Sequence, residues 1–317
     1  MGYNYNINKI GGKENKIIMF DNKSKFFKIH ELYNGVTAIS GLIGELAFLI
    51  RGREKALLID TLTGIGSLKA FCRELTDLPI LVVNSHGHVD HVGSNSEFIY
   101  VYVHPLDIDM SFYQASMEKK TEFLSRGGFL ESLYKKGYSN KDLVKDDPFF
   151  AIPINDGEYF DLGGRKIEAI HIPGHSRGSI ALLDINEKTV FIGDSICDGM
   201  LLNLENSTSV EEYLESMEYL KTHAIRFDRM YWSHGTQSLP TYHIDEAIEV
   251  SRDVLNGRDD SAINREHPFY CTKSTDGITK LPKNRWANLN YDKNRIFKKE
   301  RPKLIVEYKN RDFNTFD

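Results

Sequence analysis

Residues 84–91 read Asn-Ser-His-Gly-His-Val-Asp-His, and this stretch decides how the rest of the sequence is interpreted. It places three histidines and one aspartate within six positions, directly after the short apolar run at residues 79–83. A run of that length and composition predicts a buried strand. Loops that follow strand ends are free to carry functional side chains, while the strand fixes where the loop begins. The stretch therefore predicts a functional loop at the end of a strand.

The spacing of the polar residues in this loop indicates metal binding. His86 and His88 are two positions apart, so on an extended segment both imidazoles project to the same side. Gly87 between them allows a sharp backbone path without a colliding Cβ. Asp90 and His91 follow and can face a second point close by. Imidazoles with a carboxylate suit zinc, and also iron or manganese.

Three further strand ends carry residues that can bind a metal, each beside a glycine. They are His175 after the predicted strand at 166–172, Asp194 after the one at 189–192, and His234 after the one at 230–233. Each is weak evidence by itself. Together with the first loop they predict a site for two metals, because one loop alone supplies too few ligands.

The ordered set of motifs resembles that of a known family. HGHVDH, PGHS, GDS and SHG, in this order, are similar to the motifs of the metallo-β-lactamase superfamily of metallohydrolases. The similarity runs from about residue 27 to residue 255. It implies an α/β (α+β) fold: a four-layer αββα sandwich of two mixed β-sheets flanked by helices, with the metals at the rim where strands end.

The resemblance also implies a role for each site residue. It assigns His86, His88 and His175 to a first metal, Asp90, His91 and His234 to a second, and Asp194 to a bridge between them. Asp90 would in addition orient the attacking hydroxide or carry a proton to the leaving group. Asp60 would be either a partner of a ligating histidine or a turn residue capping the next helix. We expect two divalent ions, zinc first, with iron and manganese left open.

The remaining pattern predicts one domain over residues 1–317. Further strands are expected at 27–40, 46–50, 55–60, 99–103 and 179–184, with helices over 68–75, from 209 onward and over 242–255. Residues from about 106 to 150 are Lys/Glu-rich and predict a helical insertion, which either packs on the body of the fold or forms a lid. Residues from about 257 to 317 form a C-terminal extension whose pattern is weak and whose end is basic.

Charge and composition limit the partners. The net charge of −5 gives no basic field that would attract nucleic acid or an acidic membrane. We find no signal peptide and no apolar run of the roughly 18 residues that a membrane span needs. The three cysteines are few and scattered, which is typical of a reducing compartment, so we expect a cytoplasmic protein. The oligomeric state cannot be predicted from this pattern.

These observations predict a metal-dependent hydrolase of a small ester, thioester or lactone that uses a metal-bridging hydroxide. Two alternatives stay open. One is a phosphodiesterase or nuclease of the same fold, and the other is a metal-containing binding or sensory protein with little turnover. Oxygen-reducing diiron members of the family typically have a glutamate where this chain has His88, which argues against redox chemistry.

Overall fold

The computed structural model describes residues 24–258, 276–278 and 286–299 of the chain. A seven-stranded sheet has the order β1-β2-β3-β4-β5-β6-β7, and a five-stranded sheet has the order β13-β11-β10-β9-β8. The strands of the first are β1 (Lys28–Tyr33), β2 (Val36–Ser40), β3 (Leu46–Arg51), β4 (Ala56–Ile59), β5 (Ile80–Val83), β6 (Tyr100–Val103) and β7 (Phe150–Pro153). Those of the second are β8 (Tyr159–Asp161), β9 (Lys166–His171), β10 (Ile180–Asp184), β11 (Thr189–Phe191) and β13 (Arg229–Tyr231). Both sheets mix parallel and antiparallel pairs, as predicted.

The strands of the first sheet are apolar on both faces, and β3 shows why. Leu46, Phe48 and Ile50 point into the core between the two sheets. Ala47 and Leu49, which alternate with them, point into a second core on the outer face. Successive side chains of a strand project to opposite faces, so a strand buried on both faces must be apolar throughout. The inter-sheet core is closed from the other side by the five-stranded sheet.

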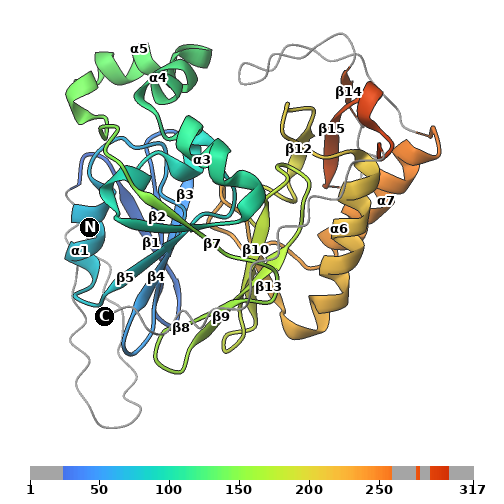
Figure 1. Cartoon of the computed structure of the whole chain (residues 1–317), viewed down its shortest axis with the longest axis horizontal. Helices are drawn as coiled ribbons and strands as arrows, with labels where there is room; N and C mark the ends of the chain where they lie inside the picture. The colour runs from blue at the N-terminus through green and yellow to red at the C-terminus, as the bar shows by residue number, and fades with distance from the viewer. Residues whose placement is uncertain (1–23, 259–275, 279–285, 300–317) are drawn as a thin grey trace, which may run out of the picture.

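Helices cover the outer faces and complete the αββα arrangement (Figure 1). The α-helices of the described residues are α1 (Leu68–Leu75), α2 (Val89–Val92), α3 (Ile108–Gln114), α4 (Met117–Ser125), α5 (Phe129–Lys135), α6 (Val210–His223) and α7 (His243–Leu255). The apolar stripe of α1 packs on the first sheet, and α6 and α7 pack on the second. The capping box predicted from Ser209 and Glu212 is present at the start of α6.

Residues 106–150 are mainly helical, as the sequence predicts, and include α3, α4 and α5. Leu124 and Leu133 of this segment pack with Ile65 in a small apolar cluster. Lys120 is fully buried, and its ammonium donates to the carbonyl of Gly93, just after α2, at 3.2 Å. These contacts hold the helical segment against the body of the fold. Its function as a lid stays a prediction.

The sequence did not predict a third, three-stranded sheet of order β12-β15-β14, whose strands are β12 (Asp198–Leu202), β15 (Asn288–Asp292) and β14 (Asp276–Ile278). It brings part of the region after residue 257 beside α6 and α7 (Figure 1). In the basic segment, Lys298 pairs with Glu215 of α6. Arg301 and Lys303 lie outside the described residues.

The topology brings the predicted functional loops to one edge. β9 and β11 both run antiparallel to β10, and β13 runs parallel to β11. β9, β11 and β13 therefore point in one direction, and the loops after them emerge at the same rim. The loop after β5, in the other sheet, joins this rim where the amide of Ile180 donates to the carbonyl of Ser85 at 2.8 Å.

Candidate metal centre

All seven side chains singled out from the sequence lie together at this rim. They form two groups, His86, His88 and His175 in the first, and Asp90, His91, Asp194 and His234 in the second. Within each group every residue offers one ligand atom, and these atoms lie within 4.8 Å of one another. Side chains from four different loops thus converge in two adjacent clusters.

Asp194 lies between the two groups. Its Oδ2 is 3.2 Å from Nε2 of His234 and 3.5 Å from Nε2 of His91, both in the second group. The same oxygen is 3.8 Å from Nε2 of His175 in the first group. Asp90 belongs to the second group alone, since its Oδ2 is 3.5 Å from His234 and 3.6 Å from His91. This is the arrangement that a bridging carboxylate requires.

In four of the clustered histidines, the ring nitrogen that faces away from the cluster (the outer nitrogen) contacts a protein oxygen. Nδ1 of His86 lies 3.0 Å from the Ser85 hydroxyl, Nε2 of His88 lies 3.3 Å from Oδ1 of Asn206, Nδ1 of His91 lies 2.9 Å from Oδ2 of Asp60, and Nδ1 of His175 lies 3.1 Å from the Leu201 carbonyl. An oxygen acceptor draws the ring proton to the outer nitrogen and leaves a lone pair on the inner one. The inner nitrogens are therefore prepared to accept a cation.

The inner atoms fit a pair of cations. Nε2 of His86, Nε2 of His91 and Oδ1 of Asp194 are buried and have no hydrogen-bond partner in the described part of the chain. Nδ1 of His88 and Nε2 of His175 face each other at 2.9 Å. Buried polar atoms are normally paired, and a cluster of unpaired ones needs an explanation. A bound cation in each group would accept the lone pairs of these atoms and so give them a partner.

The histidines of the first group are held in the neutral form that metal binding requires. Burial and then the imidazoles of His91 and His88 keep the pKa of His86 well below its ordinary value. Burial also lowers the pKa of His88. Burial and the neighbouring His88 lower the pKa of His175 to about 4.

The second group is electrostatically different because it contains two carboxylates. Burial opposes charge on every member, but the opposite charges of the group outweigh it. The imidazoles of His91 and His234 lower the pKa of Asp90 to about 2, and they hold that of Asp194 well below its usual range. The carboxylates in turn raise the pKa of His234 to about 9 and that of His91 well above its ordinary value. A cation entering this group would take the place of imidazole protons.

Asp60 contacts one of the histidines and does not cap a helix. Its carboxylate accepts from the amide and the hydroxyl of Ser85 at 2.7 and 2.8 Å, and its Oδ2 lies 2.9 Å from Nδ1 of His91. The N-cap of α1 is Ser67. Asp60 is fully buried and has a φ of 64°, a strained value that surrounding contacts must maintain.

Sequence reasoning missed a wall of the site formed by residues 203–206. Asn206 lies beside His88, and its amide also donates to the sulfur of Met110 on α3. The guanidinium of Arg295 anchors this loop by donating to the carbonyls of Leu202, at 2.7 Å, and of Glu205, at 3.2 Å. No sequence motif identifies Asn206 or Arg295, because each contacts residues that lie far away along the chain.

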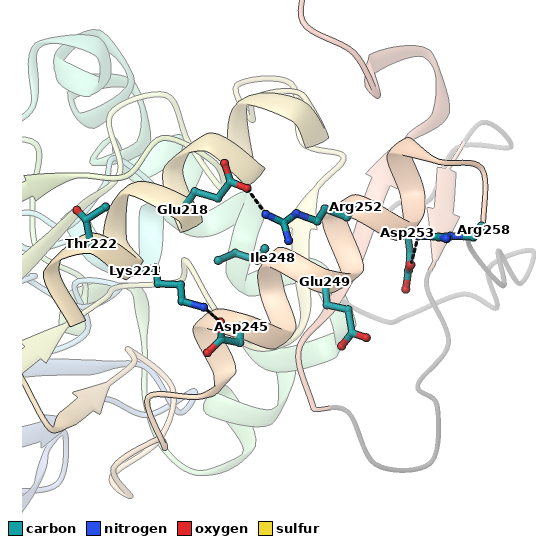
Figure 2. A pocket seen from close by; sticks show the side chains of 9 residues that line it. All are labelled: Glu218, Lys221, Thr222, Asp245, Ile248, Glu249, Arg252, Asp253 and Arg258. Carbon is teal, nitrogen blue, oxygen red and sulfur yellow. Dashed lines mark hydrogen bonds and ion pairs between the residues drawn. The ribbon is translucent and has the colours of Figure 1, made fainter. Parts of the chain in front are cut away.

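A groove between α6 and α7 lies apart from the metal centre (Figure 2). Its side chains pair with one another across and along the helices: Glu218 with Arg252, Lys221 with Asp245, and Asp253 with Arg258. Exposed ion pairs of this kind contribute little to stability. None of the seven clustered residues lines this groove. We therefore assign it no role in the chemistry.

Comparison with known families identifies the superfamily to which the chain belongs. A sequence model of the family described as "Metallo-beta-lactamase superfamily" matches residues 41–225, more than half of the chain. The chain belongs to the metallo-beta-lactamase superfamily. The matched region of this superfamily member runs from the loop after β2 to the end of α6 and contains six of the seven clustered residues. His234 lies just beyond it.

Several curated proteins are similar to this superfamily member. Acyl-coenzyme A thioesterase MBLAC2 of Homo sapiens is 30% identical over 185 residues, which cover 55% of this chain and 66% of that protein. The Gallus gallus protein of the same name is 29% identical over 182 residues, covering 55% and 65%. Hydroxyacylglutathione hydrolase GloC of Haemophilus influenzae is 28% identical over 123 residues, covering 39% and 52%. The match thus spans just under two thirds of the thioesterases.

Solved structures agree on the fold. A metallo-beta-lactamase from Pontibacter korlensis superposes with a TM-score of 0.51 at 15% identity, covering 72% of this chain and 99% of that one. One from Erythrobacter litoralis gives 0.51 at 16% identity, covering 73% and 98%. At this identity the likeness shows the fold alone. No helix in the described ranges has the length and apolar character needed to cross a bilayer.

Proposed function

We propose that the chain hydrolyses thioesters of small acyl groups at a centre of two divalent cations, with acyl-coenzyme A as the substrate class. The observation that carries the proposal is the pair of donor groups that share Asp194. The choice of a thioester is supported by similarity to proteins named acyl-coenzyme A thioesterases. Zinc is the proposed metal, because three imidazoles in one group and mixed imidazole and carboxylate ligands in the other suit it.

In this proposal His86, His88 and His175 hold one cation, Asp90, His91 and His234 hold the other, and Asp194 contacts both. When bound, two such ions would lower the pKa of a nearby water and would stabilise negative charge that develops on the carbonyl oxygen. The protein's part is to keep the imidazoles neutral in the first group and to fix each ring through its outer oxygen partner.

Asp90 is the proposed proton carrier. Its side chain is 14% exposed, whereas that of His91 beside it is fully buried. The Asp90 carboxylate would accept a proton from the water that attacks the acyl carbon, and the C–S bond would then break. The leaving thiolate needs little help, because thiols have a pKa near 8.5, and Asp90 would return its proton to the sulfur. Water and thioester thus give carboxylic acid and thiol.

The test is a substrate panel on the metal-loaded protein, scored by release of free thiol, of chromophore or, for the lactone, of acid. It should contain acyl-coenzyme A esters of increasing chain length, S-lactoylglutathione, a homoserine lactone, an aryl ester and bis-p-nitrophenyl phosphate. We expect the acyl-coenzyme A esters to give the highest kcat/KM. Activity confined to the phosphodiester would overturn the proposal, and full metal content without turnover would favour a binding or sensory protein.

The matched variants are His88→Ala and His30→Ala. His88 belongs to the first donor group, whereas His30 lies on β1 and contacts the hydroxyl of Ser40 at 3.0 Å. Loss of thioesterase activity in His88→Ala alone is expected. Equal activity in the two variants would show that hydrolysis does not take place at this centre.

A further inference from the structure

A second buried carboxylate, Asp107, lies behind the first donor group. It ends the short 3-10 turn Pro105–Asp107 after β6 and is 1% exposed. Asp107 occupies the N-cap position of α3, yet its side chain makes no hydrogen bond to that helix. Aspartate at an N-cap normally bonds to the helix amides. The carboxylate of Asp107 is directed elsewhere.

Its acceptors are used by two loops that carry candidate ligands. Oδ2 accepts from the amide of Gly87 at 2.9 Å and from the hydroxyl of Ser176 at 2.5 Å. Oδ1 accepts from the amide of Gly178 at 2.8 Å. Gly87 stands between His86 and His88, and Ser176 follows His175. One carboxylate therefore joins the two loops from which the whole first group is built.

Both loops approach this corner closely, and at Gly178 a side chain would overlap Asp107 itself. A Cβ at Gly178 would lie 2.5 Å from Cγ of Asp107. A Cβ at Gly87 would lie 2.7 Å from Cε of Met110 and 3.1 Å from the carbonyl oxygen of Asp107. Gly87 does not have a positive φ, so its backbone conformation does not demand glycine. A Cβ there would displace the flexible end of Met110 and press on the Asp107 carbonyl. The backbone amides can thus reach the carboxylate directly.

We propose that Asp107 is a positioning residue for the first cation: it sets the spacing of His88 and His175 by holding their loops together. Asp60 has the corresponding place behind the second group, where it contacts His91. The two inner nitrogens of His88 and His175 face each other at 2.9 Å, on the two loops that Asp107 joins. This inference rests on the two-cation centre proposed above.

Asp107→Asn tests the proposal with little change in volume. An amide side chain has one acceptor oxygen and one NH₂ donor. With the oxygen toward Gly178, the NH₂ group faces the Gly87 amide and cannot accept from it. With the amide flipped, the NH₂ group faces the Gly178 amide. In either orientation one buried backbone amide, that of Gly87 or that of Gly178, loses its acceptor. In the flipped orientation the second loop keeps the bond from the Ser176 hydroxyl.

The readout is the binding of Co²⁺ to the metal-free protein, followed by visible absorption and by competition with a chelator. His88→Ala and His234→Ala assign the spectral bands to the first and second groups. We expect Asp107→Asn to bind cobalt about 10- to 100-fold more weakly in the first group, the usual effect of losing a partner of this kind. Binding in the second group should change by less than about threefold. Ser176→Ala, which removes one donor, should weaken the first group by a smaller factor.

Asp184→Asn is the matched control for loss of a buried carboxylate. Asp184 is fully buried and accepts from Nε of Arg165 at 3.0 Å, at the end of β10 far from the rim. Unchanged cobalt binding in Asp107→Asn, or equal weakening in both groups that Asp184→Asn reproduces, would overturn the proposal. Failure of the thioester assay would leave this result standing, because cobalt binding is measured without substrate.

Discussion

Replacing Asp60 by asparagine gives a sharp test of how the second donor group is prepared. Oδ1 of Asp60 accepts from the buried amide of Ser85 at 2.7 Å, and Oδ2 lies 2.9 Å from Nδ1 of His91. The asparagine oxygen must stay with the Ser85 amide, since an NH₂ group there would leave two buried donors facing each other. Its NH₂ group then points at Nδ1 of His91. That nitrogen has to accept, so the ring proton moves to Nε2, the atom aimed at the centre.

The expected result is a selective loss of metal affinity. A histidine in the wrong tautomer cannot offer Nε2 to a cation, and losses of this kind amount to about 10- to 100-fold, or roughly 1.4–2.7 kcal/mol. The first group should change less, because the Ser85 amide keeps its acceptor and His86 is reached from Asp60 indirectly, through the Ser85 hydroxyl. The assay is equilibrium dialysis against Zn²⁺ with a chromophoric competitor, alongside thermal unfolding of the metal-free protein.

Ser233→Ala is the control for this prediction. The hydroxyl of Ser233 lies 3.4 Å from the Asp60 carboxylate and contributes only a weak contact. Its Zn²⁺ affinity should stay close to that of the wild type. If folded Asp60→Asn protein binds two zinc ions with wild-type affinity, the tautomer argument is wrong.

Three substitutions test the framework around the site. Phe48→Ala empties the inter-sheet core, where the ring of Phe48 lies 4.8 Å from that of Phe191, and should cost about 3–5 kcal/mol in the free energy of unfolding by denaturant. Lys120→Met leaves the carbonyls of Gly93 and Val144 without their donor and should cost about 1–3 kcal/mol in the same measurement; an unchanged midpoint would show that water replaces the ammonium. Ser209→Ala removes half of the capping box of α6 and should cost about 1 kcal/mol in thermal unfolding, with activity retained.

The parts of the fold that could be predicted are those with a local signature. The apolar run at β5, the stripe of α1 and the capping box of α6 each depend on residues within one or two turns or a single strand. The site was predictable for the same reason. Each candidate ligand follows a strand end within a few residues, and the resemblance to the family supplied the grouping of the seven. Geometry then places all of them at one rim.

The parts that could not be predicted depend on pairing between distant segments. β12 pairs with β15 across the register Leu201↔Asn290, and neither short strand has a pattern that names the other. Asp107 likewise reaches Gly87 and Gly178, which lie 20 and 71 positions away. An aspartate after Pro-Leu at a helix start is expected to be a cap, and only the fold reveals that it holds two loops instead.

The anchoring of residues 203–206 by Arg295 has a consequence for biosynthesis. Every one of the seven clustered residues has been synthesised by the time His234 is added to the growing chain, whereas Arg295 follows some sixty residues later. A nascent chain can therefore gather all seven clustered side chains while Asn206 and its loop still lack their tether. Convergence of these side chains and completion of the surrounding wall can then be separate events in time, in that order.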